Sequence, residues 1–177
     1  MTSYDMKLYL IGLPGSGKSV LAKKISRSLR LPVFDLDECI EMQEGVKISE
    51  IFSAKGQEYF RTIEADALRK QSESKEFVMA TGGGTPCFHN NMNFINQAGI
   101  SIFLDTPVTE IVKRMDGSQR KLRPLLENEP DEKIKQALDK LRLSRLPFYQ
   151  QANFTINLTN IEASDILQLI NAKKHTQ

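Results

Sequence analysis

Short apolar runs alternate along the chain with amphipathic stretches. The apolar runs predict five buried strands, at Lys7–Ile11, Pro32–Asp35, Phe77–Ala80, Ile100–Leu104 and Phe154–Leu158. The stretches between them predict helices, at Lys18–Leu29, Ile48–Lys55, Gln57–Lys70, Asn91–Ala98, Val108–Met115, Asp131–Leu143 and Ser164–Ala172. Thr106-Pro107 predicts a helix start with a capping hydroxyl. This order indicates an α/β fold with a five-stranded, mostly parallel sheet between two helical layers.

Length and composition indicate one domain of a soluble globular protein over residues 1–177. The chain has 40% apolar and 26% charged residues and a net charge of +2, which indicates neither a nucleic-acid nor a membrane partner. No apolar run spans a membrane, and the first residues lack a signal-peptide pattern. Cys39 and Cys87 have no metal-ligand spacing. We expect a cytoplasmic monomer with free thiols.

The segment 12–19 matches the phosphate-binding pattern G-x-x-x-x-G-K-[ST] between a predicted strand and a predicted helix. Its glycines let backbone N–H groups approach phosphate oxygens, and the helix N-terminus adds partial positive charge. Lys18 can bridge the β- and γ-phosphates, and the Ser19 hydroxyl can bind Mg²⁺. The alternative is a glycine-rich turn that binds nothing. We expect ATP to be bound by Pro14, Gly15, Ser16, Gly17, Lys18 and Ser19.

Asp35 and Asp37 come at the end of the second predicted strand. On an extended strand, residues i and i+2 lie on the same face, so both carboxylates are expected to point the same way. One can hold Mg²⁺ and the other can accept the proton of an attacking hydroxyl. The alternative is an ordinary polar turn after a strand.

Three glycines, Gly82, Gly83 and Gly84, follow the third predicted strand. They permit close approach of the backbone to a ligand, with N–H groups that can bind substrate oxygens. A flexible turn is the alternative.

The polar connection at about 116–130 is long for a compact domain. We expect a mobile lid that excludes water during phosphoryl transfer, with Arg123 neutralising charge on the transferring group. The alternative is a solvated surface loop.

Two arginines lie on predicted apolar helix faces. Arg145 falls eleven residues after Ile134, almost three helical turns, and so continues a core-facing stripe. An inward guanidinium is costly without an anion, so Arg145 and Arg61 together predict bidentate capture of a substrate carboxylate. The alternatives are an ion pair of Arg61 with Glu64 or Glu58, and an Arg145 side chain that reaches water.

Taken together, these motifs resemble the shikimate kinase family. The matching elements are Gly-Leu-Pro-Gly-Ser-Gly-Lys-Ser at 12–19, Asp-Leu-Asp at 35–37, Phe-Arg-x-x-Glu at 60–64, Thr-Gly-Gly-Gly at 81–84, Arg-Pro-Leu-Leu at 123–126 and Arg-x-Pro-Phe-Tyr at 145–149. The resemblance spans residues 7 to about 170. It implies a P-loop, nucleoside-monophosphate-kinase-like fold with an acceptor-binding region at about 35–64. It also implies ATP-dependent phosphorylation of the shikimate 3-hydroxyl, on the route to chorismate and the aromatic amino acids.

The resemblance also implies roles for individual residues. Ser19 and Asp35 would hold Mg²⁺, and Lys18, Asp37 and Arg123 would be the catalytic residues. The acceptor would be bound by Asp37, Arg61, Gly82, Gly83, Gly84 and Arg145, and ATP would also be contacted by Arg123.

Two segments depart from the family pattern, and two other readings stay open. No residue matches the family's adenine-side arginine cleanly, for which Arg114 is the candidate, and 157–160 lacks the aspartate expected near adenine. A gluconate kinase would share the phosphate loop, the sheet and the lid, but has no need for two inward arginines. A GTPase-type switch is echoed by Asn-Glu-Pro-Asp at 128–131, where glutamate stands in place of lysine.

Overall fold

The computed structural model describes residues 6–115, 129–157, 164–166 and 168–169. Its sheet consists of β1 (Lys7–Ile11), β2 (Val33–Asp35), β3 (Phe77–Ala80), β4 (Ile100–Leu104) and β5 (Phe154–Ile156), in the order β2-β3-β1-β4-β5. All four strand pairs are parallel. The central strand β1 pairs on both sides, and Leu8 faces Val78 on β3 and Ile100 on β4. The predicted five-stranded parallel sheet is confirmed.

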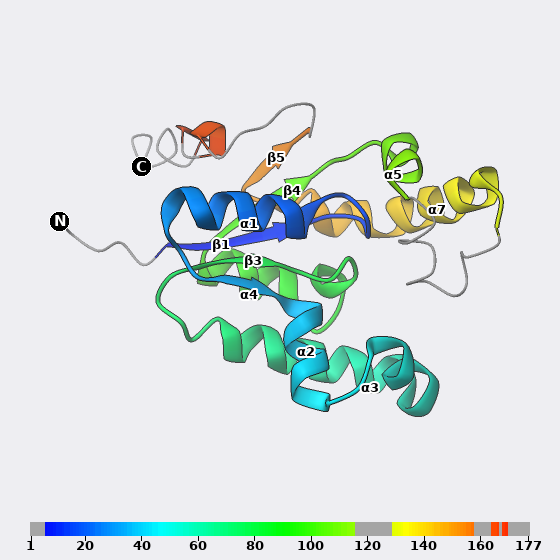
Figure 1. Ribbon diagram of the computed structural model, residues 1–177, viewed down its shortest axis with the longest axis horizontal. Helices are drawn as coiled ribbons and strands as arrows, with labels where there is room; N and C mark the ends of the chain where they lie inside the picture. Colours follow the sequence, from blue (N-terminus) through cyan, green and yellow to red (C-terminus); the bar gives the residue numbers. More distant parts are fainter. Residues whose placement is uncertain (1–5, 116–128, 158–163, 167, 170–177) are drawn as a thin grey trace.

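Helices cover both faces of this sheet (Figure 1). They are α1 (Lys18–Leu29), α2 (Leu36–Glu44), α3 (Ile48–Gln71), the short 3₁₀ helix η1 (Thr85–Cys87), α4 (Asn91–Ala98), α5 (Val108–Arg114) and α7 (Asp131–Tyr149). In Figure 1, α2 and α3 lie together along one edge, and α5 and α7 lie at the end towards which the strands point. No helix in the described ranges is both long and apolar enough to cross a membrane.

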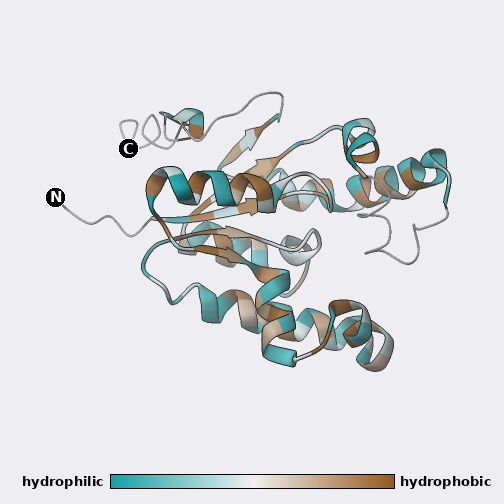
Figure 2. Ribbon diagram, viewed as in Figure 1, coloured by the Kyte–Doolittle hydropathy of each residue, from teal (hydrophilic) through white to brown (hydrophobic). Residues whose placement is uncertain are grey.

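The two-residue period of β1 divides its side chains between two apolar cores. Tyr9 and Ile11 join the core formed with α3, α4, α5 and α7. Leu8 and Leu10 join the core formed with α1, where Leu21, Ala22 and Ile25 face the sheet. Figure 2 shows the corresponding distribution, with brown strands between helices that carry teal residues outside. Burial on both faces explains why the strands are almost continuously apolar.

Several predicted element boundaries differ from the structure. α2 was not predicted, and it begins at Leu36, directly after the predicted end of the second strand. The helices predicted on either side of Gly56 form α3, whose backbone is non-helical at that glycine (φ 78°, ψ 177°). α7 runs past its predicted end through Pro147 to the buried Tyr149, so tertiary packing outweighs the proline. β5 ends at Ile156, and the described residues of the predicted helix 164–172 are helical.

Candidate active site

The phosphate loop joins β1 to α1 at the carboxyl edge of the sheet. α1 begins at Lys18, and the loop residue before it, Gly17, has a left-handed conformation (φ 98°). The Lys18 ammonium group is buried and donates hydrogen bonds to the carbonyls of Gly12 and Leu13, at 3.0 and 2.8 Å. The loop therefore concentrates a helix N-terminus and a lysine at one point, as phosphate binding requires.

Thr106, in the connection between β4 and α5, supports the phosphate loop. Its hydroxyl donates to the Ser16 carbonyl at 2.9 Å, and both residues are buried. The prediction that Thr106 caps the following helix is wrong, because the N-cap of α5 is Pro107 and has no side-chain cap bond. The hydroxyl is instead used to hold the loop in place.

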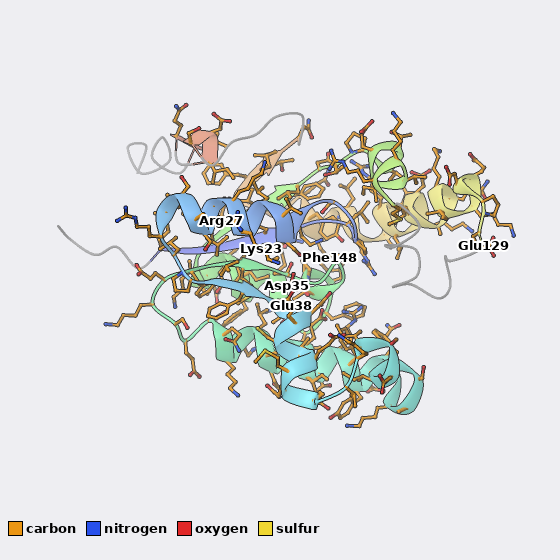
Figure 3. The ribbon with its side chains drawn as sticks, in the orientation of Figure 1. Lys23, Arg27, Asp35, Glu38, Glu129 and Phe148 are labelled. Carbon is orange, nitrogen blue, oxygen red and sulfur yellow. The ribbon has the colours of Figure 1, made fainter. Side chains whose placement is uncertain are left out.

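Asp35 connects the phosphate loop to the start of α2. The Ser19 hydroxyl donates to Asp35 Oδ2 at 2.5 Å, and the Asp37 N–H donates to Asp35 Oδ1 at 3.2 Å. Asp35 is thus the N-cap of α2, the favoured position for an aspartate at a helix start. The prediction that Asp35 and Asp37 share a strand face is wrong, because Asp37 already lies in the first helical turn. Figure 3 shows Asp35 at this junction of β2 and α2.

A cavity of about 550 Å³ lies at this edge of the sheet. Most of the residues predicted from the sequence line it together: Pro14, Gly15, Lys18, Ser19, Asp35, Asp37, Arg61, Gly82, Gly83, Gly84 and Arg145. Ser16 and Gly17 belong to the phosphate loop but do not line the cavity. Arg123 and residues 116–128 lie outside the described residues, and Arg114 is exposed on α5 and does not line the cavity.

The Asp37 carboxylate has an unusual electrostatic environment. Its side chain is open to the cavity, but the surrounding protein desolvates it, and the nearby Asp35 and Glu64 carboxylates repel its charge. These effects raise its pKa from 3.8 to about 6, although Lys18 and Arg61 act in the opposite direction. Near neutral pH, Asp37 can therefore accept a hydrogen bond or a proton more readily than an ordinary aspartate.

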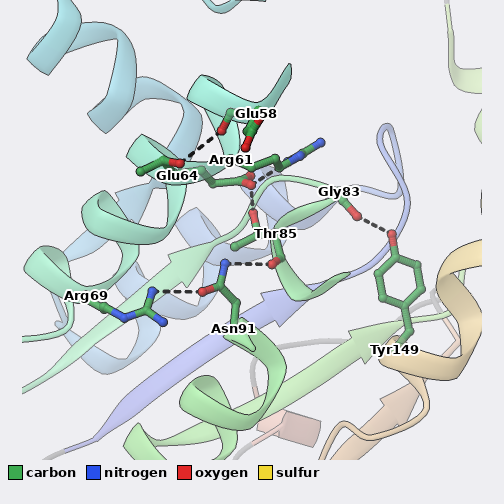
Figure 4. A network of polar contacts seen from close by, with 9 residues as sticks. Glu58, Arg61, Glu64, Arg69, Gly83, Thr85, Asn91 and Tyr149 are labelled. Carbon is green, nitrogen blue, oxygen red and sulfur yellow. Dashed lines mark hydrogen bonds and ion pairs between the residues drawn. The ribbon is translucent and has the colours of Figure 1, made fainter. Parts of the chain in front are cut away.

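Arg61 is held on the cavity wall by Glu64. Its Nη1 atom donates to Glu64 Oε2 at 2.5 Å, and the other Glu64 oxygen accepts from the Thr85 hydroxyl at 2.6 Å (Figure 4). Its guanidinium also lies over the Phe88 ring, 4.5 Å from the centroid. The alternative of an ion pair with Glu64 is thus realised, but that pair leaves the buried Nε atom without a partner among the described residues.

Arg145 approaches the same cavity from α7. Its Nη1 atom is buried and has no hydrogen-bond partner within the described ranges. Buried polar atoms are normally satisfied, so an unpaired guanidinium nitrogen in a cavity wall indicates that a ligand supplies the acceptor. The predicted inward orientation of Arg145 agrees with its position.

The three glycines at 82–84, hereafter the glycine loop, lie between the phosphate loop and Arg61. A Cβ on Gly83 would lie 2.7 Å from Pro14 Cδ, and a Cβ on Gly84 would lie 2.5 Å from Arg61 Nη2. No other residue fits these positions without displacing its neighbours, so the run is required by close packing.

Sequence reasoning missed other residues of the cavity. Glu64 was considered only as an ion-pair partner of Arg61, although its place in the Phe-Arg-x-x-Glu motif was a usable signal. Part of the wall is apolar, and this part was read as ordinary core: Ile48, Phe52, Phe60, Ile134, Ala137, Leu138 and Leu141. Apolar periodicity alone does not distinguish a cavity wall from a filled core.

Comparison with known proteins decides the family. The family model described as shikimate kinase matches residues 14–173 of this chain. The chain belongs to the shikimate kinase family. A shikimate kinase from Bacteroides fragilis is 37% identical over 153 residues, which cover 84% of this chain and 83% of the relative. As a member of this family, the chain is an ATP-dependent kinase that phosphorylates shikimate.

Solved structures agree in fold. A shikimate kinase from Acinetobacter baumannii in complex with shikimate has a TM-score of 0.84 and 35% identity, and the match covers 96% of this chain and 94% of the other. A gluconokinase from Sinorhizobium meliloti has a TM-score of 0.56 and 13% identity, and the match covers 93% of this chain and 89% of the gluconokinase. That likeness shows a common fold alone, so the shikimate kinase family accounts for the chain and the gluconate kinase alternative does not.

Proposed function

We propose that the cavity binds ATP and shikimate side by side and transfers the γ-phosphoryl group to the shikimate 3-hydroxyl. The observation that carries this assignment is the pair of buried guanidinium nitrogens, Arg61 Nε and Arg145 Nη1, that have no partner among the described residues. Two guanidinium groups that line one cavity fit a carboxylate, and shikimate carries one.

The acceptor side also provides groups for hydroxyls. Asp37 would bind the reacting hydroxyl and accept its proton, a role that suits a pKa of about 6. The glycine loop would donate backbone N–H groups, and residues 35–64 would form the acceptor-binding region. In phosphoryl transfer, holding the acceptor oxygen in line with the phosphorus contributes more than proton removal.

On the nucleotide side, the phosphate loop (Pro14, Gly15, Ser16, Gly17, Lys18 and Ser19) would bind the triphosphate. Lys18 would exchange its bonds to the loop carbonyls for phosphate oxygens and stabilise the charge that develops there. Arg123, in the lid expected at 116–130, would contact the transferring phosphoryl group; this role remains a prediction.

The donor set at the edge of β2 fits Mg²⁺. The Ser19 hydroxyl and the Asp35 carboxylate lie within hydrogen-bond distance of each other, and oxygen donors of this kind are those that the ion prefers. These two residues would hold the ion, which neutralises phosphate charge when bound.

We further propose that the chain works as a monomer in the cytoplasm. The phosphate loop, Asp37, Arg61 and Arg145 of the same chain line one cavity, so the proposed chemistry needs no second copy. Cys39 and Cys87 are free thiols, which a reducing compartment preserves. Size-exclusion chromatography with light scattering tests the oligomeric state.

A coupled ADP-release assay tests the proposed function. The purified chain is supplied with ATP and Mg²⁺ together with shikimate, with gluconate or with no acceptor. We expect ADP release only with shikimate, above a slow background hydrolysis. Equal rates with shikimate and without an acceptor would contradict the proposal, and a rate with gluconate alone would move the assignment to a polyol kinase.

A further inference from the structure

All three carbonyls of the glycine loop accept hydrogen bonds, and one donor comes from a distant element. The first and third carbonyls accept from the backbone N–H groups of Thr85 and Cys87, at 3.2 and 2.9 Å, inside the turn that leads into η1. The middle carbonyl, that of Gly83, accepts from the Tyr149 hydroxyl at 2.5 Å (Figure 4). Tyr149 therefore links the end of α7 to the glycine loop.

Tyr149 is itself fixed in position. It is fully buried, and its ring lies 5.1 Å from the ring of Phe103 on β4. Burial raises its pKa to about 12, so the hydroxyl keeps its proton and remains a donor near neutral pH. The ring anchors the helix to the sheet while the hydroxyl reaches the glycine loop.

Arg145 lies on the same face of α7 as Tyr149, one helical turn earlier. One short helical segment thus carries both a guanidinium that lines the cavity and a hydroxyl that holds the glycine loop, which lines the same cavity. The two side chains also interact directly, because Arg145 forms a side-chain hydrogen bond with the Tyr149 hydroxyl that acts against the effect of burial on the Tyr149 pKa.

The bond at the Gly83 carbonyl also orients an N–H group. A peptide unit is planar and trans, so fixing the Gly83 carbonyl fixes the direction of the Gly84 N–H. In the described part of the chain, no protein acceptor takes a hydrogen bond from the N–H of Gly83 or Gly84. Successive glycines have the greatest backbone freedom, so these donors need an outside restraint to stay aligned.

We infer that Tyr149 is a positioning residue for the acceptor. Its hydroxyl holds the Gly83 carbonyl so that the N–H donors of the glycine loop keep a fixed position relative to the Arg145 guanidinium. The inference rests on the proposed function, which assigns Arg145 and the glycine loop to the same ligand. Shikimate carries its carboxylate and hydroxyls on one small ring. The Arg145 guanidinium and the N–H groups of the glycine loop must therefore be correctly placed at the same time.

The variant Tyr149→Phe tests this role, because it removes the hydroxyl and keeps the ring against Phe103. Steady-state kinetics measure kcat and the KM values for shikimate and ATP, and calorimetry measures the Kd for shikimate. We expect the KM and Kd for shikimate to rise about three- to tenfold, the loss typical of one hydrogen bond. The KM for ATP should stay within about twofold of wild type, because the nucleotide side is untouched.

Tyr9→Phe is the matched control. Tyr9 is also fully buried, and its hydroxyl donates to Ser72 Oγ at 2.8 Å while its ring meets Phe77 edge-on. Ser72 lies eleven residues beyond Arg61 along α3, about 16 Å at the rise of a helix. This control should lose a similar amount of thermal stability and keep the wild-type KM for shikimate.

Two results would overturn the inference. One is an unchanged KM and Kd for shikimate in Tyr149→Phe; the other is an equal rise in Tyr9→Phe, which would indicate a general effect of destabilisation. Both variants are assayed well below their unfolding midpoints, so that reduced stability does not enter the comparison. Arg145→Lys is assayed in parallel. An unchanged KM for shikimate in Arg145→Lys would contradict the proposed function. An unchanged KM in Tyr149→Phe alone would contradict only the positioning role of Tyr149.

Discussion

The Ser19 hydroxyl donates a hydrogen bond to the Asp35 carboxylate at 2.5 Å, across the junction between α1 and the end of β2. This contact joins a phosphate-loop residue to the residue that caps α2. Asp37 follows two positions later and lines the same cavity, so under the proposed function one short segment would serve both substrates. Substitution of Asp35 and substitution of Asp37 should therefore reduce activity for different reasons.

Asp35→Asn should lower activity and recover part of it as Mg²⁺ is raised, because its proposed role is to hold the ion. Asp37→Asn should not recover, since the lost function is to orient the acceptor hydroxyl and accept its proton. Background ATP hydrolysis without shikimate should survive in Asp37→Asn. ADP release is measured for both variants with and without shikimate over a range of Mg²⁺ concentrations. Full recovery of Asp37→Asn at high Mg²⁺ would show that Asp37, not Asp35, holds the ion.

Arg61→Lys and Arg145→Lys should weaken shikimate binding with little effect on ATP. Lysine keeps the charge but cannot reproduce the two-pronged contact of a guanidinium with a carboxylate. We expect the KM for shikimate to rise at least about 30-fold in each variant, the equivalent of about 2 kcal/mol. Shikimate methyl ester provides the control, because it should bind the variants and the wild type almost equally. Tight binding of the ester to the wild type would show that neither arginine binds a carboxylate.

Gly83→Ala should impair both substrates, because its Cβ would lie 2.7 Å from Pro14 Cδ and push the glycine loop off the phosphate loop. Overpacking of this kind typically costs about 1–3 kcal/mol of stability. Gly99→Ala is a matched control whose Cβ would lie 2.4 Å from the Lys7 carbonyl, at the far end of β1. Thermal unfolding should show both variants destabilised, and kinetics should show raised KM values for Gly83→Ala alone. Wild-type kinetics in Gly83→Ala would contradict the tight packing of the two loops.

Asp37→Asn should be more stable than the wild type near pH 8 in the absence of metal and nucleotide. The folded pKa of about 6 lies above the ordinary 3.8, so the fold disfavours the ionised carboxylate. As pH falls from about 6 towards 4, the folded wild type takes up its proton before the unfolded chain does, and the advantage of the variant should shrink.

Thermal unfolding in EDTA at several pH values measures that difference. Glu38→Gln, in the same first turn of α2 but outside the cavity, controls for the loss of a negative charge at a helix N-terminus. A stability difference between Asp37→Asn and wild type that does not change with pH would show that Asp37 titrates normally.

Much of the fold could be predicted because strands buried on both faces are continuously apolar and the helices between them are amphipathic. β1, β3 and β4 have the predicted bounds, and so do α1 and α4. The end of β2 could not be predicted in the same way. There the Asp37 N–H donates the capping bond to Asp35, and α2 begins directly after the strand. Over three residues, the sequence pattern of a strand with alternating side chains cannot be distinguished from that of a helix cap.

Phosphate-loop chemistry and the inward arginines could be read from the sequence because each has a local signature. The contact of Glu64 with Thr85 and the contacts of Thr106 and Tyr149 could not, since the partners lie 21, 90 and 66 residues away. Their roles depend on which strands are neighbours in the sheet, which periodicity does not reveal. The same limit applies to the apolar wall of the cavity, where Leu138 and Leu141 follow an ordinary core pattern.

Phosphorylation of shikimate at its 3-hydroxyl in this cavity can be tested by identifying the product. The purified chain is incubated with ATP, Mg²⁺ and shikimate, and phosphorus and carbon NMR spectra are recorded as the reaction proceeds. We expect stoichiometric ADP and a single phosphate monoester whose phosphorus couples to C3 of the ring. Inorganic phosphate as the main product, or an ester at another hydroxyl, would contradict this expectation.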